Sequence, residues 1–122
     1  MKKILLLSVL VIGIIFMAGA KIGANMNQDV TQVSAKHILV STEQQAMDLK
    51  AKIDKNEISF EDAAKQYSSC PSGKQGGDLG YFPRGMMVKP FEEAAFSAEV
   101  NKVTNPVQTQ FGWHLIKVTD KK

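Results

Sequence analysis

Three side chains of this 122-residue sequence could do acid-base or nucleophilic chemistry near neutral pH: His37, His114 and Cys70. Because the sequence has a single cysteine, an internal disulfide is excluded. The histidines and the cysteine lie far apart along the chain, and no two of them have the short spacing of metal ligands. We therefore expect neither a metal nor another cofactor.

Both histidines fall in short stretches that alternate as β-strands do, His37 in 35–40 and His114 in 113–118. Because alternate residues of a strand face the same side, each imidazole should stand among apolar residues and not beside the adjacent lysines. The rings would meet if these strands paired at the centre of a sheet, but alternation does not establish that pairing. Two buried histidines that only hold strands in register remain the alternative, and Cys70 could likewise be a small buried apolar residue.

Helix caps and apolar periodicity predict the elements that carry these residues. Ser41 with Gln44 predicts the start of a helix that ends near Asn56. Ser59 with Asp62 predicts the start of a second helix. The buried residues of the two helices are expected to be Ala46, Leu49, Ile53, Phe60, Ala63, Ala64 and Tyr67.

The rest of the chain is predicted from turn residues and short apolar runs. A glycine-rich span covers 68–85, a short helix covers 91–98, and strands cover 103–107 and 113–118 around a loop at 108–112. This order of elements predicts an α+β fold in which a small sheet is covered by helices.

The first residues differ in composition from the rest. Lys2 and Lys3 precede a run without charge that extends to Ala20, which is typical of a signal peptide or a membrane anchor. Residues 21–33 are polar and are expected to be a flexible linker, followed by a folded domain over 34–122. We therefore expect an extracytoplasmic protein, with membrane contact possible through residues 4–20.

Charge gives no indication of a nucleic-acid partner. The formal net charge is +3, and Lys2 and Lys3 supply two of these charges, which leaves +1 for the remainder. The basic residues of that remainder are dispersed among acidic ones, so no basic patch is predicted.

Five stretches in order resemble one known family, the parvulin-type peptidyl-prolyl cis/trans isomerases. They are Ala-Lys-His-Ile-Leu-Val (35–40), Ser-Ser-Cys-Pro-Ser-Gly (68–73), Gly-Gly-Asp-Leu-Gly-Tyr-Phe (76–82), Met-Val-Lys-Pro-Phe (87–91) and Pro-Val-Gln-Thr-Gln-Phe-Gly-Trp-His-Leu-Ile-Lys-Val (106–118). The resemblance covers about residues 34–120. It implies a four-stranded antiparallel sheet wrapped by helices.

The resemblance also implies roles for individual residues. His37 and His114 would pair at the sheet centre with Thr109 in their hydrogen-bond network, and Cys70 would lie at the floor of the site. The pocket for the substrate proline would be formed by Leu79, Met87, Phe91 and Phe111, and Gln110 would touch the substrate backbone. No Arg/Lys cluster follows the first strand, so selectivity for phosphorylated sites is not expected.

The implied activity is acceleration of X-Pro bond rotation in unfolded or flexible proline-containing polypeptides. Two alternatives remain at this point. One is a peptide-binding module or chaperone of the same fold with little turnover. The other is a thiol hydrolase in which Cys70 acts with His37 or His114.

Overall fold

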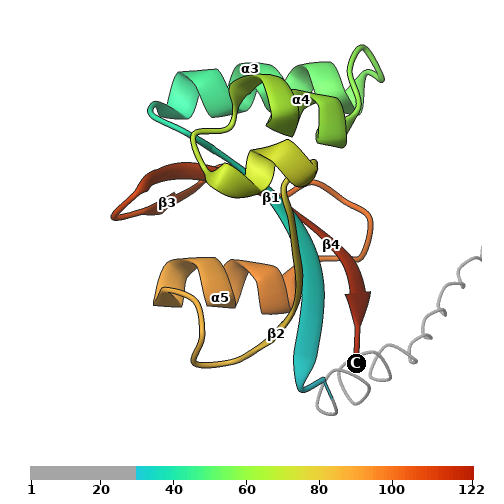
Figure 1. The fold of residues 1–122 in the computed structure, drawn as a ribbon, viewed down its shortest axis with the longest axis vertical. Helices are drawn as coiled ribbons and strands as arrows, with labels where there is room; N and C mark the ends of the chain where they lie inside the picture. The colour runs from blue at the N-terminus through green and yellow to red at the C-terminus, as the bar shows by residue number, and fades with distance from the viewer. Residues whose placement is uncertain (1–29) are drawn as a thin grey trace, which may run out of the picture. The chain divides into compact units, whose positions relative to one another are not determined.

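The computed structural model describes residues 30–122, and the folded unit runs from Thr31 to Lys122. The predicted signal or anchor segment (1–20) and most of the predicted linker lie outside the described residues. The elements are β1 (Gln32–Val40), α3 (Glu43–Asp54), α4 (Phe60–Tyr67), the 3-10 turn η2 (Pro71–Gln75), β2 (Asp78–Pro83), α5 (Lys89–Ser97), β3 (Val107–Thr109) and β4 (Gly112–Lys121) (Figure 1). None of the helices in this described part is long and apolar enough to cross a bilayer.

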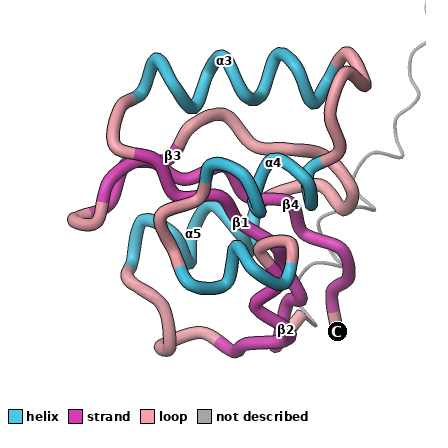
Figure 2. Tube along the Cα trace, turned by 45° about the horizontal axis from the view of Figure 1, so that its top comes forward, coloured by secondary structure: helices cyan, strands magenta, loops and turns pink. Residues whose placement is uncertain are grey.

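The four strands form one antiparallel sheet in the order β2-β1-β4-β3, which confirms the predicted fold class. The two long strands β1 and β4 are therefore central neighbours, and Figure 2 shows them side by side. Their register places Leu39 opposite His114 and His37 opposite Ile116. The strands that carry the two histidines are thus paired directly.

Helices cover both faces of the sheet. In Figure 1, α3 and α4 lie together on one side and α5 lies on the other. The core between the sheet and α3/α4 consists of Ile38, Val40, Ala46, Leu49, Phe60, Ala63, Ala64 and Leu115. The opposite face carries the two imidazoles, and Phe91 of α5 packs edge-on against both. One layer is therefore purely apolar, whereas the other contains the polar residues that could do chemistry.

The first strand starts earlier than predicted, at Gln32 and not at Ala35. Val33, which we expected in the flexible linker, is completely buried. It pairs with Phe82 of β2 and with Lys121 of β4. Because both partners are distant in sequence, nothing local to residues 30–34 reveals this pairing.

The helix starts are partly as predicted. Ser59 caps α4, accepting the Asp62 N–H at 3.0 Å, and Asn56 (φ 62°) follows the end of α3. The cap of α3 is Thr42 and not Ser41: the Thr42 hydroxyl accepts the Gln45 N–H at 3.1 Å. Thr42 has the extended backbone that a cap needs, and its hydroxyl oxygen stands three residues before a helical N–H.

Tyr67 was predicted to be buried and is 41% exposed. It is the last residue of α4, where η2 packs closely against the helix. A Cβ on Gly73 would lie 2.7 Å from the Ala64 carbonyl oxygen, so backbone fills the space beside this end of α4.

The strand predicted over 103–107 was also wrong. The regular strand is β3 (Val107–Thr109), joined to β4 by a short turn at 110–111, and Val103 forms one isolated bridge to Lys117. Pro106 has no N–H to donate to a ladder, so the pairing that starts near Val103 cannot continue through it.

Candidate functional site

The two histidines meet at the centre of the sheet. Their positions in the β1–β4 register are diagonal neighbours on one face. Their Nδ1 atoms are 3.0 Å apart, and the ring planes are nearly parallel, at 19°. His37 is 5% exposed and His114 is 4% exposed. A contact between residues 77 positions apart thus follows from strand register.

Both imidazoles are neutral at physiological pH. Burial, aided by the proximity of His114, lowers the pKa of His37 from 6.5 to about 4. Burial also lowers the pKa of His114. The two Nδ1 atoms lie at hydrogen-bond distance, so one of them carries a proton and the other accepts it.

The pair continues at both ends into hydroxyl groups. His114 Nε2 lies 2.8 Å from Thr109 Oγ1, and His37 Nε2 lies 3.1 Å from Ser72 Oγ. Thr109 Oγ1 also accepts the Phe111 N–H. All four ring nitrogens therefore have a partner, which is what buried imidazoles require.

The proton positions depend on the tautomers of the two rings, and both directions of the chain satisfy these contacts. In one direction, Thr109 donates to His114 Nε2, His114 Nδ1–H donates to His37 Nδ1, His37 Nε2–H donates to Ser72 Oγ, and the Ser72 hydroxyl donates to Cys70 Sγ at 3.3 Å. In the other direction every role is exchanged, and the Cys70 thiol donates to Ser72 Oγ. In both cases Ser72 joins Cys70 to the histidine pair.

Cys70 is held beside β1 by its neighbours. The Ser68 hydroxyl accepts the N–H groups of Leu39 (3.0 Å) and Cys70 (3.3 Å). The Ser69 N–H donates to the Leu39 carbonyl at 2.7 Å. These bonds attach the segment before η2 to the strand that carries His37, and Cys70 remains half-buried.

Gly77 positions His37 from the same edge of β1. Its carbonyl accepts the His37 N–H at 2.9 Å. Its φ of +84° suits glycine, and a Cβ there would lie 2.3 Å from the His37 carbonyl oxygen. A side chain at this position would therefore push β2 away from the strand that carries His37.

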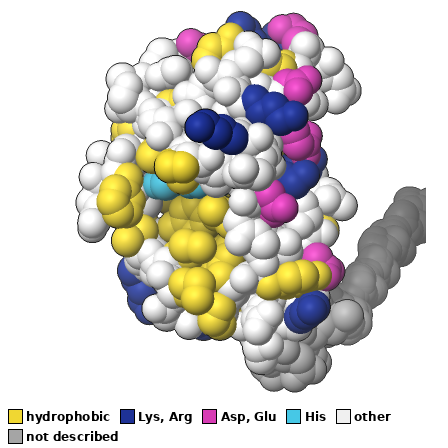
Figure 3. All heavy atoms as spheres, viewed as in Figure 1, with side chains coloured by type: hydrophobic (Ala, Val, Ile, Leu, Met, Phe, Trp, Pro, Cys, Tyr) yellow, Lys and Arg dark blue, Asp and Glu magenta, His cyan; other side chains and the backbone are white. Residues whose placement is uncertain are grey.

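An apolar pocket of about 500 Å³ opens above the histidine pair. In Figure 3, yellow side chains surround a hollow that has histidine at its upper edge. The residues that line it are His37, Leu39, Ser69, Cys70, Pro71, Leu79, Met86, Met87, Val88, Phe91, Phe111 and His114. None of these is Lys, Arg, Asp or Glu. Such a pocket suits an apolar ring better than a charged ligand.

The structure brings most of the predicted site residues together. Leu79, Met87, Phe91 and Phe111 all line the pocket, with Phe91 buried below it and Phe111 62% exposed at its rim. Thr109 lies behind the pocket and reaches it only through His114. Gln110 is exposed in the β3–β4 turn and does not line the pocket.

Several further residues belong to the site and were not among the predicted site residues. Leu39 lines the pocket and could have been found, since it lies two positions from His37 in the same strand. Met86 lies at the rim, 65% exposed. Ser72, in the Ser-Ser-Cys-Pro-Ser-Gly stretch, joins His37 to Cys70, and no local pattern distinguishes it from neighbouring serines.

A second hollow of about 630 Å³ contains none of these residues. It lies beside α3 and the start of α4, and its lining includes Lys50, Asp54, Glu61 and Lys117. Its charges of both signs, and the absence of histidine and cysteine from its lining, make it a poorer candidate for the functional site.

Comparison with known proteins agrees with this geometry. Residues 20–122 match the PPIC-type PPIASE domain. The solution structure of NmPin, the parvulin of Nitrosopumilus maritimus, has a TM-score of 0.67 and 42% identity, covering 74% of this chain and 97% of that one. The chain therefore belongs to the PPIC-type peptidyl-prolyl isomerase domain family, that is, to the parvulins.

Longer relatives share the same domain. The foldase protein PrsA of Geobacillus kaustophilus is 52% identical over 92 residues, which are 75% of this chain and 32% of that protein. The crystal structure of the peptidylprolyl isomerase PrsA from Bacillus anthracis has a TM-score of 0.74 and 42% identity, covering 80% of this chain and 46% of that one. This chain spans about a third of the length of the curated relatives that it matches.

Proposed function

We propose that this chain accelerates cis/trans rotation about X-Pro bonds, and that the apolar pocket holds the substrate's prolyl ring. The observation that carries the proposal is an uncharged pocket whose base is formed by a thiol and two neutral, mutually bonded imidazoles. His37, Cys70, His114 and Thr109 are the proposed catalytic group. Membership of the isomerase family supports the reaction type.

The reaction needs no bond to break. Resonance in the amide sets a rotation barrier of ~18–20 kcal/mol, and spontaneous exchange takes tens to hundreds of seconds. Exchange in milliseconds requires an acceleration of about 10⁴-fold, or roughly 5.5 kcal/mol. Stronger binding of the twisted amide than of the planar one is sufficient to supply this difference.

An apolar pocket that excludes water favours the twisted state of the amide. A planar amide is stabilised by conjugation and charge separation, and water solvates that charge separation. The twisted amide has lost part of it, so removal from water penalises the twisted state less. Leu79, Met87, Phe91 and Phe111 would exclude water around the ring, while Cys70 and the imidazoles adjust the local field.

The contacts of Cys70 argue against a thiol hydrolase. A nucleophilic cysteine needs an imidazole nitrogen free to take its proton. Here Sγ bonds to the Ser72 hydroxyl at 3.3 Å, and the nitrogens of His37 and His114 are all bonded to groups other than the thiol. A supporting role for Cys70 in rotation is consistent with these contacts.

The proposed substrates are unfolded or flexible proline-containing polypeptides without phosphate. The pocket rim is apolar and open at Met86 and Phe111, so a chain can be placed across it. No cation lines the pocket to pair with a phosphate. Gln110 lies in the adjacent turn, from which it could reach the substrate backbone outside the pocket.

The proposed location is outside the cytoplasm. Support comes from the basic start and uncharged run of residues 1–20. Export would bring such a domain to chains that fold after secretion, for which slow prolyl rotation limits folding. Removal of this segment as a signal peptide and membrane attachment through residues 4–20 are the two alternatives within this proposal.

An exchange measurement tests the proposal. The purified full chain is added to X-Pro peptides that vary the residue before proline, and cis/trans exchange is followed by NMR. We expect faster exchange, reduced strongly in Met87→Ala and unchanged in Met47→Ala, an exposed methionine on α3. Exchange at the spontaneous rate for every peptide would overturn the enzyme assignment. If aggregation of a client were nevertheless suppressed, the chaperone alternative would replace it.

A further inference from the structure

One buried charge of the described fold lies outside the pocket. Glu92 of α5 has only 3% of its surface exposed, and its carboxylate does not line the pocket. A buried carboxylate is unfavourable unless it is paired and hydrogen-bonded. The partners of Glu92 therefore indicate which part of the structure the carboxylate stabilises.

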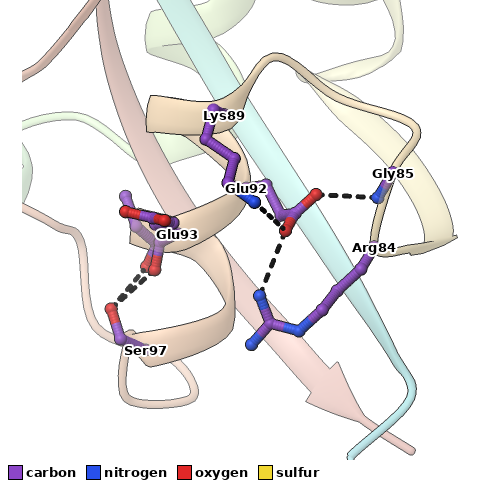
Figure 4. Close-up of polar contacts among 7 residues, drawn as sticks. Arg84, Gly85, Lys89, Glu92, Glu93 and Ser97 are labelled. Atoms are coloured by element: carbon purple, nitrogen blue, oxygen red, sulfur yellow. Dashed lines mark hydrogen bonds and ion pairs between the residues drawn. The ribbon is translucent and has the colours of Figure 1, made fainter.

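All the polar partners of this carboxylate lie at the β2–α5 junction. The Gly85 N–H donates to Oε1 at 2.7 Å, Arg84 Nη1 lies 3.1 Å from Oε2, and Lys89 Nζ lies 3.9 Å from Oε2 (Figure 4). The Gly85 N–H is the main cause of a lowered Glu92 pKa, with Arg84 and Lys89 adding to it. The carboxylate is therefore ionised at neutral pH.

The loop held by Glu92 forms one edge of the pocket. Residues 84–88 connect β2 to α5, and Met86, Met87 and Val88 of this loop line the pocket. We call these three residues the methionine lip. Gly85 has no heavy atom within 4 Å of the place where a Cβ would be, so this side of the loop is open. The Gly85 N–H bond to the Glu92 carboxylate attaches the loop to α5 at this point.

Arg84, one of the partners of Glu92, is also linked by packing to the pocket residue Phe91. Arg84 lies over the Phe96 ring, with its guanidinium carbon 4.2 Å from the ring centroid. Phe96 packs against Phe82, and Phe82 packs against Phe91. Glu92 follows Phe91 directly in α5, so one helical turn carries both the buried pocket residue Phe91 and the anchor of the lip.

We propose that Glu92 is a positioning residue that fixes the methionine lip at its distance from Phe91, and so keeps the prolyl pocket closed to water on that side. Methionine is the most flexible of the apolar side chains, so a lip built from it needs a fixed backbone. Displacement of such a wall by about 1 Å is enough to reduce the rate strongly. This proposal rests on the proposed isomerase function.

Two substitutions in the full chain test the anchor. Glu92→Gln keeps an oxygen for the Gly85 N–H but loses the charge that binds Arg84, whereas Glu92→Leu loses both. We expect kcat/KM to fall on the order of 10- to 100-fold in Glu92→Leu and less in Glu92→Gln. The matched control is Glu61→Gln, which removes a carboxylate paired with Lys36 at 2.6 Å on the α3/α4 side. It should keep the wild-type rate.

A second readout separates positioning from general stability. Methyl NMR relaxation of Met86 and Met87 is measured at a temperature where circular dichroism shows every variant fully folded. We expect both methyl groups to become more mobile in Glu92→Leu and unchanged in Glu61→Gln. A fall in kcat/KM without this mobility, or this mobility without a fall in kcat/KM, would overturn the proposal.

Failure of the underlying function is distinguishable. If the wild-type chain does not accelerate X-Pro exchange, the isomerase proposal fails, and the affinity for a proline peptide replaces kcat/KM as the readout. Weaker peptide binding together with mobile lip methyls in Glu92→Leu would then still support the anchor. Unchanged peptide binding would overturn it.

Discussion

At the scale of single residues, the neutrality of the two imidazoles has a consequence for stability. His37 has a pKa of about 4 in the folded chain and an ordinary value of 6.5. Between these values the unfolded chain binds more protons than the folded chain, so stability is full above pH 6.5 and is lost as pH falls towards 4.

We therefore predict that the free energy of unfolding falls by roughly 2 kcal/mol from pH 7 to pH 5. Urea denaturation at the two pH values measures it. His37→Gln should flatten this dependence, because the group that takes up the proton is absent. An equal slope in wild type and variant would show that other groups cause the loss.

The role of Cys70 is also decided at the scale of one residue. If the thiol only supports rotation, Cys70→Ser should lower kcat/KM by about tenfold, which corresponds to about 1.4 kcal/mol of activation free energy. Cys70→Asp should also retain activity. Prolyl exchange by NMR measures both, with circular dichroism as the control for folding. Complete loss in both folded variants would instead favour a nucleophilic Cys70.

At the scale of elements, the approach of β2 to β1 depends on Gly77. We predict that Gly77→Ala destabilises the fold by roughly 3 kcal/mol or more, since it combines a positive φ with a backbone clash. Gly80→Ala is the matched control: it has a similar φ of +70° but no atom within 4 Å of the added Cβ. Thermal denaturation compares the two, and equal losses would exclude the clash as the cause.

Elements with strong local signals were predictable, and those defined by remote partners were not. Ser59 and Asn56 mark helix ends through bonds to residues three or four positions away, so their sequence pattern was sufficient. The cap choice between Ser41 and Thr42 was less clear because adjacent hydroxyls offer the same pattern. The start of β1 at Gln32 and the limits of β3 depend on β2 and β4, which no local pattern identifies.

At the scale of the whole molecule, the sheet separates stability from the site. Phe60 is buried on the α3/α4 side, whereas Phe91 contacts both imidazoles on the α5 side. We predict that Phe60→Leu lowers the free energy of unfolding by roughly 1–2 kcal/mol and leaves kcat/KM of the folded chain unchanged. Phe91→Leu should lower kcat/KM as well. Denaturation and exchange assays on the same samples measure both, and a loss of activity in folded Phe60→Leu would contradict this separation.

The sequence alone determined the strand stretches of His37 and His114, the apolar faces on which they lie, and the family with its pocket residues. The strand stretches and their faces follow from the period of a strand, which is a property of neighbouring residues. The family and its pocket residues follow from the resemblance of the five motifs. The tertiary structure decided the His37–His114 contact, the bonds that join Ser72 and Cys70 to it, the exclusion of Gln110 from the pocket and the burial of Glu92. Each of these depends on the register or packing of segments that are far apart in the chain, and many registers are compatible with the same local pattern.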